Sequence, residues 1–299
     1  MPKQDTFCSS LSVVVPVTLM SGKLEKLGSW LKEISDLPIE VLLIHDKRDD
    51  ATSLELQVLL KKLQNNKIVF KEGLYGSPGM ARNAGLEFAS NYWTCFWDSD
   101  DLPIVPIVNR LLSFKYEKEI DVIATNYILV NELTGAKKNM AIGKHLSTAI
   151  GMDPGLWRFY FKTESLLKHR FTDLHMAEDQ LFIGKYLSFN HPIQIIDLPT
   201  YRYFRGNDDH LTKQKSALND LCPATKECLR EIQDGLERNV EVLSIMFIKL
   251  IISGLRYCEI KSKSMILVIL IQGLFHRKSF VRTNIAIAIY RLIKERISF

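Results

Sequence analysis

Long hydrophobic runs are missing from this sequence of 299 residues. The two most apolar stretches, residues 242–255 and 265–275, are shorter than the roughly 18 to 20 apolar residues that span a bilayer. The first ten residues show no apolar core behind a basic start, so we expect no secretory signal. These absences disfavour a transmembrane anchor and predict a cytoplasmic protein, either free or peripheral on the inner face of the cell membrane.

Cysteine is scarce, and a strong charge imbalance is absent. No two of the five cysteines have the spacing of two to four residues that zinc sites use, so we expect reduced thiols. Lys and Arg number 39 against 34 Asp and Glu, a net charge of +5. That excess is well short of what a dedicated nucleic-acid binder carries, so no nucleic acid partner is expected.

The positive excess lies in one part of the chain. Residues 213–299 hold 15 Lys and Arg against 8 Asp and Glu, a net of +7, whereas residues 1–212 hold 24 against 26, a net of −2. The later segment shows no strand pattern and mixes Ile and Leu with basic residues, which predicts a separate helical region. Such helices can lie on an anionic membrane surface. Packing on the preceding domain or forming a homodimer with a second copy is the alternative.

The first hundred residues alternate short β-rich runs with helical patterns, which predicts an α/β fold with a mostly parallel sheet and a nucleotide-binding layout. From residue 102 to about residue 212 the pattern is mixed, with one or two strands at 121–130 and a helix at 178–187. The expected strands are 11–17, 41–44, 68–70 and 92–97, and the expected helices are 24–34, 54–63 and 79–89.

Unusual polar residues follow three of these strands, at the edge where ligands bind in open α/β sheets. Repulsion among three aspartates within four positions is costly unless a cation lies among them or solvent screens them, and carboxylate oxygens suit Mg²⁺ or Mn²⁺. The alternative is a helix N-terminus, where the helix dipole favours Asp. The strand ends carry Pro16-Val17-Thr18, His45-Asp46 and Asp98-Ser99-Asp100-Asp101.

Four motifs in order resemble the family 2 glycosyltransferases of the GT-A fold. The resemblance covers about residues 10–212, because a Glu178-Asp179 pair also opens a predicted helix about 80 residues after the aspartate cluster, where family members place such a pair. The four motifs are Val13-Val14-Val15-Pro16-Val17, Asp46 with Asp50-Ala51-Thr52, Ala81-Arg82-Asn83-Ala84-Gly85, and Trp97-Asp98-Ser99-Asp100-Asp101.

The resemblance implies a Rossmann-like GT-A catalytic domain over residues 1–212, followed by the helical region 213–299. It implies inverting transfer of a sugar from a nucleoside diphosphate sugar, with UDP favoured, to a hydroxyl of a glycan or lipid-linked acceptor in surface polysaccharide synthesis. Asp98 and Asp100 would hold Mn²⁺ or Mg²⁺, with Asp179 as general base and Glu178 beside the acceptor. The donor-binding residues would be Pro16, Val17, Asp46, Arg82, Asp98 and Ser99.

Several positions depart from the family pattern. Many members have two adjacent Asp after the second strand, followed by Gly and Ser, where this chain has His45-Asp46 and then Lys47 and Arg48. The loop that recognises the nucleobase is therefore altered, which weakens the inference of uridine. His210 lies where some related enzymes place a residue near the metal or the diphosphate, whereas Trp93 and Trp97 are expected in the core.

Two other functions compete with this interpretation. The first is a non-catalytic module that binds a nucleotide sugar or a glycan on the same scaffold. The presence of Asp98, Asp100 and Asp179 together favours the enzyme over this module. The second is a nucleotidyl or phospho-sugar transferase, and the lysine-bearing, glycine-rich loop expected near its first strand is missing here.

Overall fold

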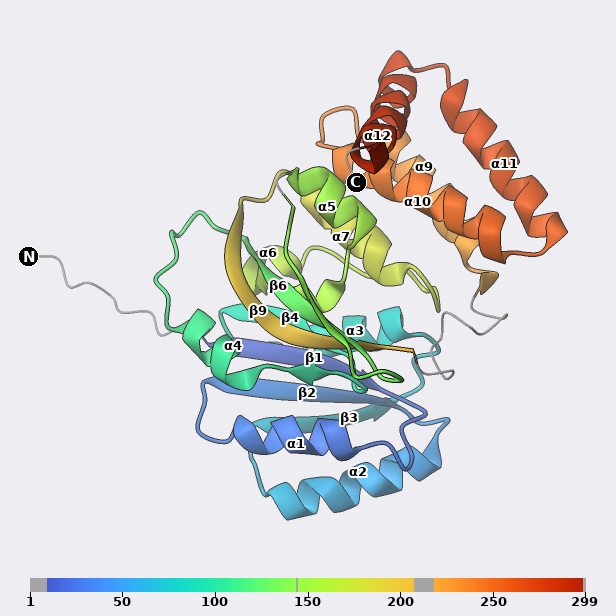
Figure 1. Ribbon diagram of the computed structural model, residues 1–299. Coiled ribbons are helices and arrows are strands. Elements are labelled where there is room, and N and C mark those ends of the chain that lie inside the picture. The colour runs from blue at the N-terminus through green and yellow to red at the C-terminus, as the bar shows by residue number, and fades with distance from the viewer. Residues whose placement is uncertain (1–9, 144, 207–217, 298–299) are drawn as a thin grey trace, which may run out of the picture. The chain divides into compact units, whose positions relative to one another are not determined.

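The computed structural model describes residues 10–143, 145–206 and 218–297 and divides them into two compact units (Figure 1). The first unit comprises the described residues up to 141 together with 156–170 and 192–206. The second comprises 142–155, 171–191 and the described residues beyond 206. Each unit is thus built from segments that are distant in sequence. The division at residue 212 stays a prediction about domains.

A mixed sheet forms the centre of the first unit. Its parallel part runs in the order β3-β2-β1-β4, and all four strands were predicted. The unbroken apolar run of β1 is buried throughout because both faces of the sheet are covered, as is usual for parallel strands. The bounds are β1 Leu11–Val17, β2 Ile39–Asp46, β3 Ile68–Gly73 and β4 Trp93–Phe96.

The sheet continues beyond β4 in the order β8-β6-β9-β5, with β7 paired to β6. Strand β8 is antiparallel to both of its neighbours, so the whole sheet is mixed although its first half is parallel. The segment predicted as one or two strands is the single strand β6, whereas β8 and β9 were not predicted as strands. The bounds are β5 Leu102–Pro103, β6 Val122–Asn131, β7 Lys137–Met140, β8 Phe159–Lys162 and β9 Ile193–Arg205.

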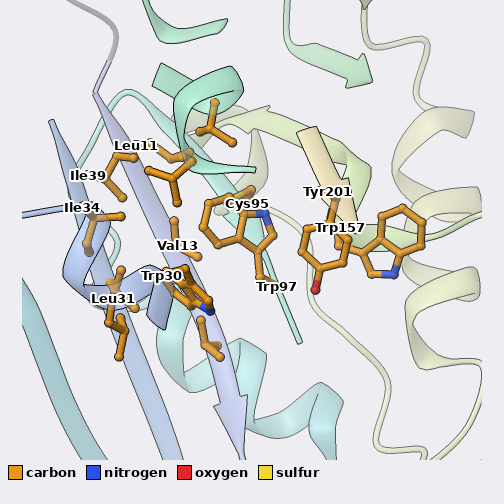
Figure 2. Close-up of a cluster of buried hydrophobic side chains, with 14 of the residues drawn as sticks. Leu11, Val13, Trp30, Leu31, Ile34, Ile39, Cys95, Trp97, Trp157 and Tyr201 are labelled. Atoms are coloured by element: carbon orange, nitrogen blue, oxygen red, sulfur yellow. The ribbon is translucent and has the colours of Figure 1, made fainter. Parts of the chain in front are cut away.

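The core on one face of this sheet combines aliphatic side chains with several large aromatic ones, as Figure 2 shows. Trp30 of α1 meets Trp97 edge to face with ring centroids 5.3 Å apart, and Trp157 stacks on Tyr201 at 4.9 Å. Trp93 and Trp97 are buried, which confirms their predicted place in the core. The helices of the unit are α1 Glu25–Glu33, α2 Asp50–Leu63, α3 Pro78–Leu86, α4 Val105–Leu112 and α6 Thr163–Leu166, with a short 3-10 turn at Leu156–Arg158.

Helix α3 packs on β1 and β2 through a glycine. Successive side chains of a strand point to opposite faces, so Val13 and Val15 enter the aromatic core while Val14 faces the other side. A Cβ added at Gly85 would lie 2.4 Å from Val14 Cγ1 and 3.1 Å from Ile44 Cγ1. Only glycine lets the helix approach the sheet this closely.

We expect Gly85→Ala to lower the free energy of unfolding by about 1–3 kcal/mol, because the added methyl overpacks the site. The change can be measured by urea unfolding followed by fluorescence, since all four tryptophans lie in the first unit. Val14→Ala removes the methyl groups that the new Cβ would meet. The double variant should therefore be less destabilised than the sum of the single variants, and strict additivity would contradict this packing.

The second unit is helical and is organised around α10. This helix contacts α5, α7, α9, α11 and α12 and buries most of its residues. Two glycines allow the close approach, since a Cβ at Gly151 of α5 would lie 2.6 Å from Ile245 and one at Gly184 of α7 2.7 Å from Met246. The helices are α5 Leu146–Met152, α7 Glu178–Ser188, α9 Leu221–Gln233, α10 Glu241–Tyr257, α11 Ile260–Leu274 and α12 Ser279–Ile297.

The described part of residues 213–299 is therefore helical, as predicted. Within the described residues, no single helix has both the length and the hydropathy needed to cross a membrane. Helices α11 and α12 meet those criteria only when taken as a pair, which is bent by 115° at the break between them. The cysteines at 95, 222, 228 and 258 are free and buried.

Candidate active site

The carboxyl ends of β1, β2 and β4 lie at one edge of the sheet, because these neighbouring strands run parallel. The three polar segments predicted at strand ends lie at this edge. Pro16 and Val17 end β1, Asp46 ends β2, and Asp98 comes shortly after β4. The Val17 side chain is buried, and its carbonyl oxygen faces His45.

His45 has a structural role at this edge. Its ring is fully buried, with Nδ1 2.8 Å from the Val17 carbonyl oxygen and Nε2 3.0 Å from the Asp49 carbonyl oxygen. The ring thus connects the end of β1 to the start of α2, where the Asp49 carboxylate accepts the Thr52 amide as an N-cap. This departure from the family pattern replaces a carboxylate with a side chain that holds two loops together.

Asp46 is engaged on both of its carboxylate oxygens. Arg48 donates to them from Nε at 2.9 Å and from Nη2 at 2.8 Å, in a bidentate pair. The amide of Gly76 donates to Oδ2 at 2.8 Å. These hydrogen bonds, those of Arg48 above all, hold the pKa of Asp46 well below its usual range. Asp46 therefore anchors the glycine-rich segment that leads into α3.

Arg82 connects α3 to the aspartate cluster. The helix begins at a Ser77 N-cap followed by Pro78, a favoured first residue of a helix, which places Arg82 in its second turn. Its Nη2 lies 2.9 Å from Asp98 Oδ1, and only 7% of the Arg82 side chain is exposed against 36% for Asp98. The amide of Asp98 donates to the Tyr201 hydroxyl at 3.0 Å. Asp98 is thus held through both its carboxylate and its backbone.

The three aspartates of the cluster lie in different surroundings. Asp100 is exposed, and Lys26 donates to its carbonyl oxygen at 3.0 Å. Asp101 is buried and accepts the amide of Phe204 at 2.9 Å. Desolvation, and then the charges of Asp100 and Asp98, raise the pKa of Asp101 well above its usual range. Ser99 between them is buried.

The donor set of the cluster fits a hard divalent cation. Among the residues that the structure describes, no three His, Cys, Asp or Glu side chains come close enough to hold a metal by themselves. Asp98 and Asp100 nevertheless offer carboxylate oxygens on the accessible side, while Asp101 is turned into the protein. Mg²⁺ and Mn²⁺ are commonly bound by one or two carboxylates, with phosphate oxygens and water completing the coordination.

Glu178 and Asp179 open α7, which belongs to the second unit. The residue before them, Ala177, has a φ of 68°, a left-handed conformation that costs a non-glycine residue about 1–3 kcal/mol. Glu178 is buried, and Asp179 accepts the amide of Gln180 at 2.7 Å. Strain kept at this position is a feature of functional sites, although acidic residues also stabilise a first helical turn. His210 lies outside the described residues.

Some residues at this edge were not identified from the sequence. Tyr201 and Gly76 hold the two loops through hydrogen bonds that no local pattern reveals. Arg48 stands two residues after Asp46, a spacing at which the two side chains of a turn can pair. This spacing was the local sequence signal for the Arg48–Asp46 pair.

A model of the family described as Glycosyl transferase family 2 matches residues 12–181, more than half of the chain. The chain belongs to this family. The matched residues run from β1 to the start of α7 and so include both the aspartate cluster and the Glu178–Asp179 pair. The prediction of a family 2 glycosyltransferase is confirmed, and the competing interpretation as a non-catalytic module is not supported.

Solved structures confirm the GT-A fold of this glycosyltransferase. The chain is similar to residues 1–349 of TarS from S. aureus in complex with UDP-GlcNAc, with a TM-score of 0.68 and 20% identity over 97% of this chain and 91% of that one. It is also similar to the mannosyltransferase PcManGT from Pyrobaculum calidifontis in complex with GDP-Man and Mn²⁺, with a TM-score of 0.52 and 11% identity over 97% and 87%. No curated protein matches the sequence.

Arg82→Ala is expected to lower the free energy of unfolding of this glycosyltransferase by about 1–3 kcal/mol. The substitution leaves Asp98 without its guanidinium partner, and the exposure of Asp98 moderates the cost. Arg82→Lys should give an intermediate loss, because an ammonium keeps the charge and loses the planar geometry.

Arg110→Ala is the control for this comparison, since Arg110 is exposed on α4 and should change stability by less than about 0.5 kcal/mol. Urea unfolding followed by tryptophan fluorescence compares the three variants. Equal midpoints for Arg82→Ala and Arg110→Ala would contradict the importance of the ion pair.

Proposed function

We propose that the protein is an inverting, metal-dependent glycosyltransferase that moves a sugar from a nucleoside diphosphate sugar to a hydroxyl of a glycan or lipid-linked acceptor in surface polysaccharide synthesis. One observation carries the proposal. Arg82 and Tyr201 hold Asp98 at the carboxyl end of β4, next to the exposed Asp100. Two oriented carboxylates at the ligand-binding edge of an α/β sheet suit a diphosphate with its cation.

The nucleotide of the donor is proposed to be UDP. Similarity to TarS, which was solved with UDP-GlcNAc and with UDP, supports this choice. PcManGT was solved with GDP-Man, so related folds also accept a purine nucleotide. The donor contacts are proposed at Pro16, Val17, Asp46, Arg82, Asp98 and Ser99. Arg48 donates to both carboxylate oxygens of Asp46. A nucleobase bound at this position would therefore contact the Arg48–Asp46 pair rather than a single carboxylate.

Asp98 and Asp100 would hold Mn²⁺ or Mg²⁺, which would neutralise negative charge on the diphosphate as it leaves. The chain's own residues prepare this site. Arg82 holds the Asp98 carboxylate in place, while Tyr201 fixes the adjacent backbone. Asp101 is buried and accepts the amide of Phe204, which fixes the turn after the cluster to β9.

Asp179 is proposed as the general base. The acceptor oxygen would attack the anomeric carbon as the bond to the diphosphate oxygen breaks on the opposite face, and the hydroxyl proton would pass to Asp179. A single displacement of this kind inverts the configuration. Glu178, which is buried at the same helix start, is proposed to position the acceptor.

A screen of UDP-sugars and GDP-sugars, with and without Mn²⁺, tests the proposed donor and metal. A saturating donor should stabilise the protein by about 2.7 kcal/mol at a concentration of 100 times its Kd, which is measurable as a rise in Tm. Asp100→Asn should lose the Mn²⁺-dependent part of this rise. Asp36→Asn, an exposed change on another surface, should retain it. Full Mn²⁺ dependence in Asp100→Asn would refute the metal assignment.

Asp179→Asn should leave the donor-induced rise in Tm unchanged while slowing sugar transfer by about 100-fold or more, since a positioned base contributes that much. Release of the nucleoside diphosphate, with water as the acceptor, gives a readout when the natural acceptor is unknown. Asp173→Asn is the control, being an exposed change in the same unit. A large loss of donor affinity in Asp179→Asn would place this carboxylate in donor binding instead.

A further inference from the structure

Helix α11 is apolar on two opposite sides. One side is buried against α9, α10 and α12 and presents Ile266, Ile269 and Gly273 to them. This contact is the ordinary use of an amphipathic helix in a helical unit. A helix that is apolar on its other side as well is typical of one that is covered on both sides.

The other side of α11 is exposed, and we name it the outer face. Its residues follow the spacing of one helical side, at intervals of seven, one, three and four positions. Phe275, directly after the helix, is 78% exposed, and Ile260 at its start is 83% exposed. From Leu267 to Phe275 this face is a row of large apolar side chains, and Lys263 and Ser264 separate that row from Ile260. The outer face consists of Ile260, Leu267, Val268, Ile271 and Phe275.

The charge around the outer face is mostly positive, although the exposed Glu259 directly precedes Ile260. From residue 260 to residue 294 the sequence contains seven Lys and Arg and no Asp or Glu. Lys261 and Lys263 lie at one end of α11, and Arg277 and Lys278 follow its other end. Basic residues therefore flank both ends of an exposed apolar row. This combination is complementary to a lipid surface, in which anionic headgroups cover an apolar layer of acyl chains.

We propose that the outer face of α11 docks the protein on an anionic lipid surface. The apolar row would enter the boundary between headgroups and acyl chains, and the flanking Lys and Arg would contact headgroup phosphates. At about 1.5 Å per residue, the 15 residues of α11 are about 22 Å long, which suits a helix lying in the plane of the surface. This inference does not rest on the proposed reaction.

A second copy of the chain fits the outer face less well. A symmetric dimer would place the same face of both copies together and would bring two sets of basic residues into one interface. No acidic residue between 260 and 294 is present to balance them. Glu241 of α10 already pairs with Arg291 of α12 within the unit.

Sedimentation of the full chain with lipid vesicles tests the proposal. Vesicles of phosphatidylcholine with phosphatidylglycerol should bind the protein, and binding should weaken as salt is raised. Vesicles of phosphatidylcholine alone should bind it far less. Leu267→Gln with Ile271→Gln should reduce binding to the anionic vesicles about tenfold or more. Lys261→Gln with Lys263→Gln should reduce both the binding and its salt dependence.

Helix α2 provides matched controls for both double variants. Leu54 and Val58 are an exposed apolar pair at the same spacing, and Lys61 and Lys62 are an exposed basic pair. Their changes to Gln should leave vesicle binding unchanged. Because all the substituted side chains are on the surface, the circular dichroism spectrum and the Tm should stay close to those of the parent chain.

Three results would overturn the proposal. The first is absence of binding to anionic vesicles, and the second is an equal loss of binding in the α2 controls. The third is a dimer, measured by light scattering, that Leu267→Gln with Ile271→Gln converts to a monomer without any vesicle binding, which would assign the outer face to a second copy. Donor binding enters none of these measurements, so failure of the proposed reaction would be seen separately.

Discussion

The ion pair between Arg82 and Asp98 is the contact on which the candidate site depends most. It holds one end of the short segment between Gly76 and Arg82 against the end of β4, and Asp46 holds the other end against β2. Helix α3 is fixed at both ends of its first two turns, and Gly85 then seats it on the sheet. Three strands that are distant in sequence are thus connected through one glycine-rich turn and the helix it starts.

The same contact changes how the clustered aspartates are understood. The sequence alone suggests that three carboxylates within four positions need a positive partner, because their charges repel one another. In the structure the three carboxylates have different surroundings: Arg82 pairs with Asp98, Asp100 is exposed at the surface, and burial raises the pKa of Asp101. Repulsion alone therefore does not require a cation. The argument for one rests on the geometry of the two accessible carboxylates and on the family.

Much of the first unit could be predicted from sequence, because continuous apolar runs and helical periodicity are local signals. The four parallel strands and the helices between them came from these patterns. Strand β8 was missed because it has only four residues, too few to show an alternating pattern, and β9 because polar residues and Pro199 interrupt it. The family followed from the order of its motifs, which does not depend on exact element bounds.

The details of the site were beyond sequence because they depend on contacts between remote segments. Nothing local indicates that both nitrogens of His45 face carbonyl oxygens, or that Tyr201 receives the amide of Asp98. Nor does the sequence show that α7 belongs to the same unit as the later helices. The metal, donor and base assignments, and the division at residue 212, stay predictions.

The contact of Gly184 with α10 has a consequence for how the protein is made. Helix α7 leaves the ribosome before α10 has been synthesised, so its glycine face has no partner at that stage. The aspartate cluster and Arg82 are present in the nascent chain much earlier. The residues of β9 that hold this cluster, Tyr201 and Phe204, follow α7 closely in the chain, whereas α7 gains its packing only after translation has passed α10.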